Sequence, residues 1–363
     1  MGTLSSAQAA ALNTAQAAAI ETTDIGQLST SAIRALSTSA VAALNTDQLA
    51  ALTSTQVAAL SSTQAAALTS NQITGIETTD LTALNTASVR SLSTNAINAL
   101  TTDQVAVLNT NQIGALGTTQ VQALRTDEVA ALTSAQAAVL SSAQVGALTS
   151  TQAQAIETTD IGAISTSGIR ALTAAAVGAL NSDQIANLVS NQIGALTTTQ
   201  IAALNTDQAA AIETRDLGAL GTASIRALTT AAVAALTTDQ IGVLTTTQVA
   251  ALATNQVAAL TTDQIAALTS ADVGALGTAQ VGAMNTAQVL AIETGDLTAL
   301  STGGVRALTT AAINAMSTDQ ISVLRTTQIG ALSTAQVAAM NTDQVASLTS
   351  TQLRTLSSAQ AAP

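Results

Sequence analysis

The stretch that decides the fold is Leu100–Val107, which reads LTTDQVAV, and Leu108 begins the same pattern again. Counted from Leu4 in steps of eight, every such position as far as Leu356 is Leu, Ile or Met, and we number the octad from this residue. Position three is Ser or Thr in every octad except at Ala174, position five is usually Gln, position six is Val, Ile, Leu or Ala, and position eight is mostly Ala. The sequence therefore predicts one continuous array of about 45 octads over residues 1–363, without separate domains.

The period of eight limits the secondary structure that can carry it. One continuous helix is excluded, because eight residues in two turns require about 4.0 residues per turn against the natural value of about 3.6, so the apolar stripe would drift around the helix. A strand fits poorly, because positions six and eight would face one side and position one the other, and Ala and Gln are weak strand formers. A short helix places positions five, eight and one on a shared face, with position six beside it. We therefore expect an all-α fold, with a β-solenoid as the alternative.

Each octad also carries a signal for starting a helix. Ser and Thr hydroxyls cap free N–H groups at helix starts, and Asp often follows position three, as at Asp47, Asp103 and Asp239, where the helix dipole favours it. We expect one capped helix of about six residues per octad, with position three as the cap. The alternative is a cap at position two, with Gln completing a capping box. We favour position three because position two also accepts Glu, Gly, Arg and Val.

Helices of this length are unstable alone, since isolated helices shorter than about 12 residues are marginal in water. They must stack on their neighbours, which predicts a superhelical solenoid. A thin core between closely packed Ala-rich faces also suits a chain without Phe, Trp or Tyr. The array begins and ends in mid-pattern without a distinct capping repeat, as expected of an excerpt from a longer array or of a chain that stacks end to end.

One charged cassette interrupts the uniform pattern five times. It begins with Ile20-Glu21-Thr22-Thr23-Asp24, and an Arg follows ten residues after the Asp. The next two octads carry Ala, Ser or Gly at position five in place of Gln. The charged residues of the five cassettes are Glu21, Asp24 and Arg34; Glu77, Asp80 and Arg90; Glu157, Asp160 and Arg170; Glu213, Asp216 and Arg226; and Glu293, Asp296 and Arg306.

The spacing of the cassettes predicts the size of a superhelical turn. Their starts, Ile20, Ile76, Ile156, Ile212 and Ile292, follow one another at intervals of 7, 10, 7 and 10 octads, so a block of 17 octads repeats above the octad level. If seven octads make two turns and ten make three, one turn contains roughly 3.4 octads, or about 27 residues, and all five cassettes lie on one side. The cassettes then either fix the register between turns, as polar groups do in other repeating structures, or form a lateral docking stripe for a second copy of the chain. The two roles are compatible.

Composition argues against several classes of function. The chain has no His, Cys or Lys, so the usual bases for activating Ser or Thr and the usual metal ligands are missing, and we expect no enzyme activity, cofactor, metal site or small-molecule substrate. The net charge of −12 and the pI near 4.1 disfavour nucleic acid as a partner. Polar residues interrupt every octad, so we expect no membrane insertion, and the first residues carry no recognisable signal peptide.

The composition resembles the Ala/Thr/Gln-rich short-repeat regions of large bacterial surface and secreted proteins, which also have few aromatic residues, no Cys and an acidic pI. This resemblance covers the whole chain and implies a stalk, a filament or an adhesin spacer at the cell surface or outside the cell. We accordingly expect a structural repeat protein that forms a rigid rod and associates with itself. The alternative is a binding module whose regular Ser and Thr rows, such as Thr101-Thr102 and Thr237-Thr238, recognise ice, a mineral or a polysaccharide.

Overall fold

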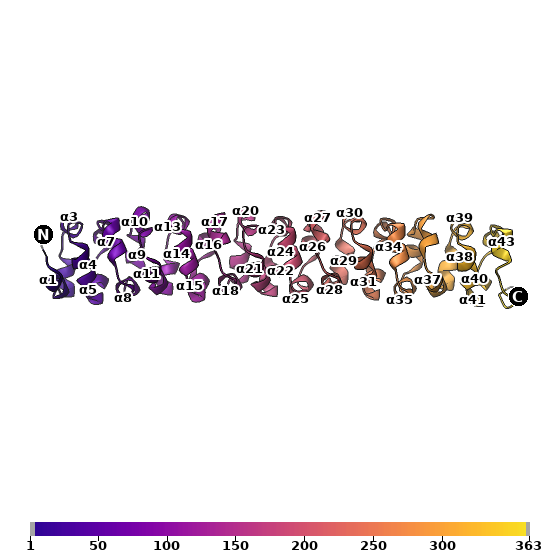
Figure 1. Cartoon of the computed structure of the whole chain (residues 1–363), viewed down its shortest axis with the longest axis horizontal. Coiled ribbons are helices and arrows are strands. Elements are labelled where there is room, and N and C mark those ends of the chain that lie inside the picture. Colours follow the sequence, from indigo (N-terminus) through magenta and orange to yellow (C-terminus); the bar gives the residue numbers. More distant parts are fainter. Residues whose placement is uncertain (1–3, 361–363) are drawn as a thin grey trace. The chain divides into compact units, whose positions relative to one another are not determined.

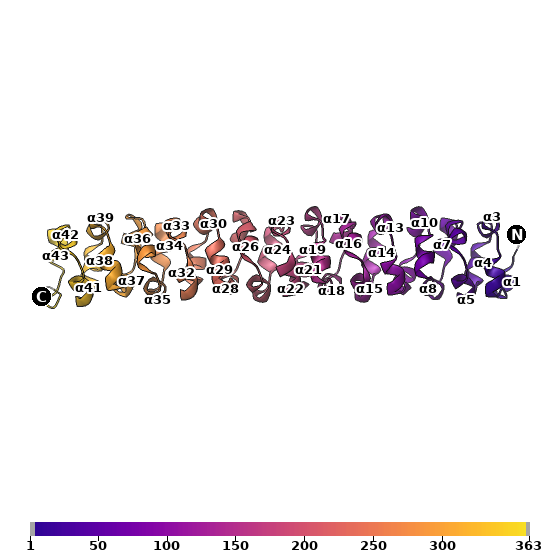
Figure 2. The same cartoon turned by 180° about the vertical axis from the view of Figure 1, so that it is seen from behind.

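The computed structural model describes residues 4–360, which contain 43 α-helices, one 3₁₀-helix and no strand. Each helix has four to six residues and occupies one octad, which confirms the predicted all-α solenoid of short helices. The chain divides into two compact units, Met1–Leu188 and Val189–Pro363. Figures 1 and 2 show that within each unit successive helices wind around a common axis.

The helices of unit 1 are α1 (Ser6–Ala10), α2 (Thr14–Ala18), α3 (Thr22–Ile25), α4 (Thr30–Ala35), α5 (Thr38–Ala42), α6 (Thr46–Ala50), α7 (Ser54–Ala59), α8 (Ser62–Ala66), α9 (Ser70–Thr74), α10 (Thr78–Leu81), α11 (Thr86–Ser91), α12 (Thr94–Asn98), α13 (Thr102–Val107), α14 (Thr110–Ala115), α15 (Thr118–Ala123), α16 (Thr126–Ala130), α17 (Ser134–Ala138), α18 (Ser142–Gly146), α19 (Ser150–Gln154), α20 (Thr158–Ile161), α21 (Thr166–Ala171), α22 (Ala174–Ala179) and α23 (Ser182–Ala186).

The helices of unit 2 are α24 (Ser190–Ala195), α25 (Thr198–Ala202), α26 (Thr206–Ala211), α27 (Thr214–Leu217), α28 (Thr222–Ala227), α29 (Thr230–Ala235), α30 (Thr238–Gly242), α31 (Thr246–Ala251), α32 (Thr254–Ala259), α33 (Thr262–Ala266), α34 (Ser270–Ala275), α35 (Thr278–Gly282), α36 (Thr286–Ala291), the 3₁₀-helix η1 (Asp296–Ala299), α37 (Thr302–Ala307), α38 (Thr310–Ala315), α39 (Thr318–Ser322), α40 (Thr326–Ala331), α41 (Thr334–Ala338), α42 (Thr342–Ala346) and α43 (Ser350–Leu353).

Position two, and not position three, caps the helices, so the preferred capping residue was wrong and the alternative is correct. At α13 the hydroxyl of Thr101 accepts the N–H of Gln104, and the Oε1 of Gln104 accepts the N–H of Thr101 at 3.0 Å. The Gln half of this capping box needs only the backbone of position two, so it persists where that residue is Gly117 or Val189. This explains why position two accepts so many residue types.

The core contains positions one, five and six. At Leu100, Gln104 and Val105 the exposed fraction is 2% or less, and the same three positions are buried through most of the array. Position eight, which we expected on the buried face, is mostly half-buried, as at Ala99. The helix begins at position three, so positions five and six point inward one turn after the cap, and position eight lies at the edge of the contact between turns.

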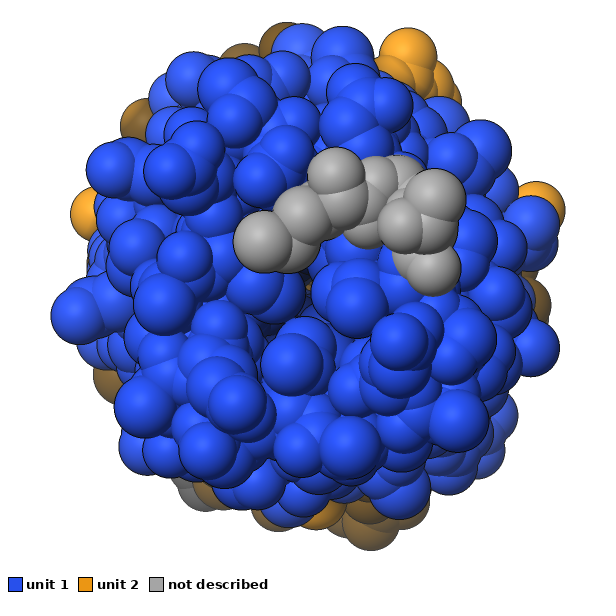
Figure 3. All heavy atoms as spheres, turned by 90° about the vertical axis from the view of Figure 1, so that its left-hand side faces the viewer, with its two compact units in different colours: residues 1–188 blue, residues 189–363 orange. Residues whose placement is uncertain are grey.

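Within each unit, contacts between turns join most helices to the third helical element after them. Examples are α8 with α11, α18 with α21 and α26 with α29. Viewed from its end, unit 1 has a round cross-section (Figure 3). It encloses a narrow internal cavity of about 10 Å³, lined by apolar side chains such as Ile113 and Leu148 together with Asp160. A cavity of this size is far too small for an organic ligand. In the described part of the chain, no helix has the length and hydrophobicity that a bilayer span requires.

Candidate functional site: the glutamine ladder and the charged cassettes

The Gln at position five links each turn to the turn before it. The side-chain amide of Gln144 donates to the carbonyl oxygens of Ile113 and Leu116, at 2.8 and 3.0 Å, and its Oε1 accepts the N–H of Ser141 at 2.8 Å. The carbonyl of Leu116 lies past the end of α14 and outside any helix, so it needs a partner from another turn. One buried amide thus satisfies three backbone groups.

We call this repeated arrangement the glutamine ladder. Its members donate to the carbonyl oxygen 28 residues earlier, and most also donate to the one 31 residues earlier, as Gln144 does. In unit 1 they are Gln48, Gln56, Gln64, Gln72, Gln104, Gln112, Gln120, Gln136, Gln144, Gln152 and Gln184. In unit 2 they include Gln240, Gln248, Gln256, Gln264, Gln280, Gln288, Gln328, Gln336 and Gln344.

The ladder agrees with the predicted size of the superhelical turn. Helices in contact are three octads apart, and the ladder reaches back between three and four octads. One turn therefore contains between three and four octads, in agreement with the estimate of roughly 3.4. In Figure 1 the cassette helices α3, α10 and α20 of unit 1 all lie on the upper side, as this period requires.

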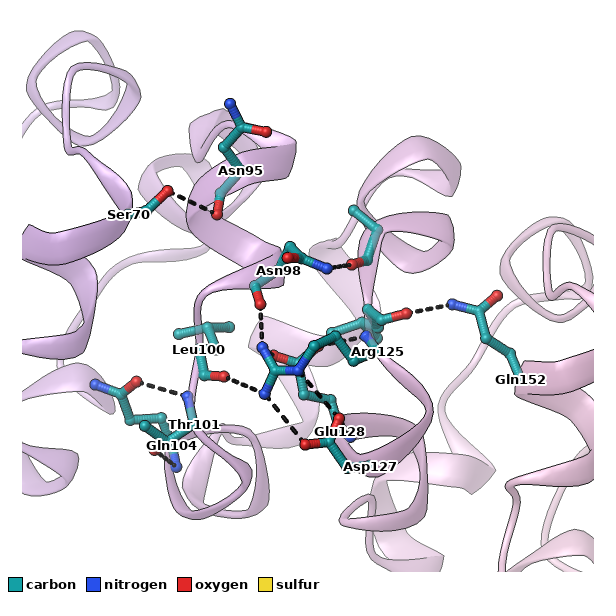
Figure 4. Close-up of polar contacts among 12 residues, drawn as sticks. Ser70, Asn95, Asn98, Leu100, Thr101, Gln104, Arg125, Asp127, Glu128 and Gln152 are labelled. Atoms are coloured by element: carbon teal, nitrogen blue, oxygen red, sulfur yellow. Dashed lines mark hydrogen bonds and ion pairs between the residues drawn. The ribbon is translucent and has the colours of Figure 1, made fainter.

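One octad replaces the ladder Gln with an acid. Glu128 is fully buried, and its Oε2 accepts the N–H of Arg125 at 2.5 Å, which preserves the Gln half of the capping box. A carboxylate cannot donate, and the guanidinium of Arg125 takes over that role. It donates to the carbonyl oxygens of Asn98 and Leu100, and it also binds Asp127 (Figure 4).

The carboxyl group of Glu128 is buried where most octads carry a neutral Gln amide, and this burial shifts its pKa. Its Oε1 lies 3.0 Å from the Nη1 of Arg125 but accepts no well-aligned hydrogen bond. Burial in the core raises the pKa of Glu128 from its ordinary value of 4.5 to about 7, and the bond from the Arg125 N–H and the charge of Arg125 oppose that rise. The hydrogen bond from the Arg125 side chain lowers the pKa of the exposed Asp127. The ionised form of Glu128 thus destabilises the ladder at this octad.

The cassette aspartates occupy position five, where the ladder Gln would stand. Asp80, Asp160, Asp216 and Asp296 each accept a hydrogen bond from a Ser hydroxyl in the preceding turn, 26 residues earlier. These serines are Ser54, Ser134, Ser190 and Ser270. In the second cassette the following position five is Ser88, whose hydroxyl donates to the carbonyl of Leu60 at 2.9 Å. The cassettes therefore replace the glutamine ladder locally with other bonds between turns.

The cassette Glu and Arg residues lie elsewhere. Glu21, Glu77, Glu157 and Glu293 stand at position two with exposed side chains, and the first three form no side-chain cap. Glu213 pairs with the neighbouring Arg215 at 2.6 Å. The five cassette arginines are exposed at position seven, and Arg34 Nε donates to the carbonyl of Ala59 at 3.4 Å. Within residues 4–360, no ion pair joins Asp80 to Arg90, Asp216 to Arg226 or Asp296 to Arg306.

The sequence contained a signal for the Ser–Asp bonds that we did not use. Most octads carry Thr at position three, but Ser stands 26 residues before four of the five cassette aspartates. The ladder itself was also missed, although position five was recognised as Gln. A polar residue that recurs on the buried face must find a partner, and this requirement alone indicates contacts with another turn.

Most of the chain matches a known repeat family. A family model described as the ALTTAQ repeat matches residues 17–54, 73–110, 105–134, 153–190, 209–246, 242–270, 265–291, 289–326 and 321–350, which is more than half of the chain. The chain belongs to the ALTTAQ repeat family. Five of the ALTTAQ matches begin three residues before a cassette isoleucine and contain that whole cassette. No curated protein matches the chain. In residues 4–360 of this ALTTAQ array, His, Cys, Asp and Glu form no group of three or more that could hold a metal ion.

Proposed function

We propose that this chain is a structural spacer, a rigid rod that forms a stalk or a filament and associates with further copies of itself. The observation that carries the proposal is the glutamine ladder. Each ladder Gln is buried and tied to the preceding turn by hydrogen bonds to main-chain carbonyls, so bending between turns would break bonds in a dry environment. Repetition of the same contact in most octads outside the cassettes suits a role that depends on length and stiffness.

We place this spacer at the surface of a bacterium or outside the cell. The support is compositional, since the chain resembles short-repeat regions of large surface and secreted proteins. A chain without cysteine also folds independently of the redox state of its compartment. In this proposal the chain has no catalytic role.

The test of the rod is small-angle X-ray scattering combined with negative-stain microscopy of the purified chain at high salt. A rod gives a scattering curve with a constant cross-section and particles of uniform width, and compact globular particles would exclude the proposal. A spacer must also resist bending, so the persistence length measured from the images should exceed the length of one particle. Particles that bend sharply at many positions would contradict the structural role.

A second candidate is a binding module for ice, a mineral or a polysaccharide. The cap uses the side chain at position two, so the hydroxyl at position three is free of capping, and it is exposed in most octads, as at Thr46, Thr94 and Thr110. A near-invariant exposed hydroxyl in each octad forms regular rows on the surface. Thermal hysteresis, or retention on insoluble glycans that Thr→Ala changes at position three abolish, would favour this candidate.

A further inference from the structure

In unit 1 the cassette Glu and Arg residues lie about half a turn of the superhelix apart. In each cassette the Arg follows the Glu by a little over one and a half octads, as from Glu77 to Arg90. One turn contains between three and four octads, so this separation is close to half a turn. In unit 1 the Glu residues precede α3, α10 and α20, which lie on the upper side in Figure 1, whereas the arginines belong to α4, α11 and α21, which lie lower.

Each side includes charged side chains that have no partner in the described part of the chain. The side chains of Glu77 and Glu157 are exposed and take part in no hydrogen bond or ion pair within residues 4–360, and the same holds for Arg90. Arg34 borders a groove between turns, lined by the small or hydroxyl side chains of Thr30, Ser31, Thr55, Ala58 and Ala59. Arg306 borders a similar groove in unit 2, together with Thr302, Gly303 and Gly330. Such a groove admits a carboxylate side chain beside the guanidinium.

The two charged sides have identical spacing. In unit 1 the Glu residues are separated by seven and ten octads along the chain, and the Arg residues by the same two intervals. Two copies that lie parallel, with the Glu side of one against the Arg side of the other, therefore bring every cassette Glu of this unit opposite an Arg at a single axial offset. One exposed ion pair contributes little, so association requires several pairs formed together.

We propose that the chain assembles side by side with further copies of itself, parallel and in register, through its cassette Glu side and its cassette Arg side. The interface is heterologous, so each copy keeps one free side of each kind and the assembly grows as an open sheet or bundle. This inference rests on the proposed structural role and specifies the partner and the contact. The fourth cassette contributes least, because Glu213 already pairs with Arg215 within its own chain.

The experiment measures mass by sedimentation velocity at low and high salt. The wild type should exceed its monomer mass of 35.7 kDa at about 20 mM salt and return to it at about 500 mM, where exposed charges are screened. A variant with all five cassette arginines changed to Gln keeps only the Glu side, and a variant with all five cassette Glu residues changed to Gln keeps only the Arg side. Each should be monomeric alone, and an equimolar mixture should form pairs and nothing larger.

A matched control changes five exposed aspartates outside the cassettes to Asn, with the same change in charge as the Glu→Gln variant. These are Asp47, Asp103, Asp183, Asp239 and Asp319. The control should assemble as the wild type does, and circular dichroism should show the same helix content in all variants. A wild type that stays monomeric at low salt, or an Arg→Gln variant that assembles normally, would overturn the proposal.

Two further outcomes separate this inference from the proposed function. Rod-shaped monomers that never associate would overturn the lateral contact alone, whereas globular monomers would overturn the structural role. Monomers that bind an anionic polysaccharide resin through the cassette arginines would also overturn self-assembly, and would assign the Arg side to a foreign polyanion.

Discussion

The change Glu128→Gln should stabilise the protein at alkaline pH. The raised pKa of Glu128, about 7 against an ordinary 4.5, means that the folded state holds the proton more tightly than the unfolded state. The proton on Glu128 therefore stabilises the folded state fully below about pH 4.5, and this stabilisation is lost as the pH rises through 7. This difference in pKa between the folded and unfolded states corresponds to about 3 kcal/mol in the free energy of unfolding, since each tenfold change in proton affinity is about 1.4 kcal/mol.

The substitution would also restore the ladder at this octad. The amide nitrogen of the new side chain would donate to the carbonyls of Ile97 and Leu100, as the neighbouring ladder members do to theirs, while its Oε1 keeps the bond to the N–H of Arg125. Loss of the ion pair with Arg125 offsets part of the gain, so we expect a net stabilisation of about 2 kcal/mol at pH 8. Near pH 4.5 the gain should largely disappear, because Glu128 is then protonated.

The assay is native-state hydrogen exchange of the amides in α12 to α16, because an array of repeats can open locally without unfolding as a whole. Protection in Glu128→Gln should rise relative to the wild type at pH 8 and match it near pH 4.5. Glu157→Gln is the control, since it removes the same charge from an exposed side chain and should change little at either pH. A destabilised Glu128→Gln variant at pH 8, or a difference from the wild type that is the same at both pH values, would show that ionised Glu128 does not destabilise the fold.

Three further substitutions test the contacts between turns. Gln144→Leu leaves the carbonyl of Leu116 and the N–H of Ser141 without their partner and removes one of the two bonds to the carbonyl of Ile113, so it should cost about 2 to 5 kcal/mol by urea denaturation. The same change at the exposed Gln122 should cost under about 0.5 kcal/mol. Ser134→Ala removes the bond from the preceding turn to the buried Asp160 and leaves only the long bond from Thr159, so it should lower the free energy of unfolding by about 1 to 2 kcal/mol, with Ser142→Ala as a near-neutral control. Gly75→Ala should destabilise by about 1 to 3 kcal/mol, because its new Cβ would lie 2.9 Å from the carbonyl oxygen of Thr46, while Gly218→Ala meets nothing within 4 Å and should be neutral or slightly stabilising in thermal melts.

The period of eight was sufficient to predict the fold, because no continuous helix keeps an apolar face at that spacing. The cassette intervals similarly predicted the size of a turn, which the ladder hydrogen bonds support. The cap lies at position two and not at position three, and variability at position two is no evidence against capping. In fact, the Gln at position five bonds to the main chain of position two, and this contact does not depend on the side chain there.

The arrangement within the cassettes could not be predicted, since it depends on which residues face one another across adjacent turns. The sequence placed Asp80 ten residues before Arg90 and suggested a charged group that fixes the register. In the structure the Asp bonds to Ser54 in the preceding turn, while Glu77 and Arg90 are exposed on nearly opposite sides. The role of the cassettes remains a prediction.

In the solenoid, residues about one turn apart in sequence lie side by side in space. The chain has no cysteine, so Ser134→Cys with Asp160→Cys introduces a single pair 26 residues apart at a contact between turns. We predict that mild oxidation forms an intramolecular disulfide in this variant, detected by mass spectrometry. The control pair, Ser142→Cys with Asp160→Cys, is closer in sequence but about two-thirds of a turn apart, and it should form little disulfide. Equal cross-linking of both pairs, or cross-linking of the control pair alone, would contradict the solenoid.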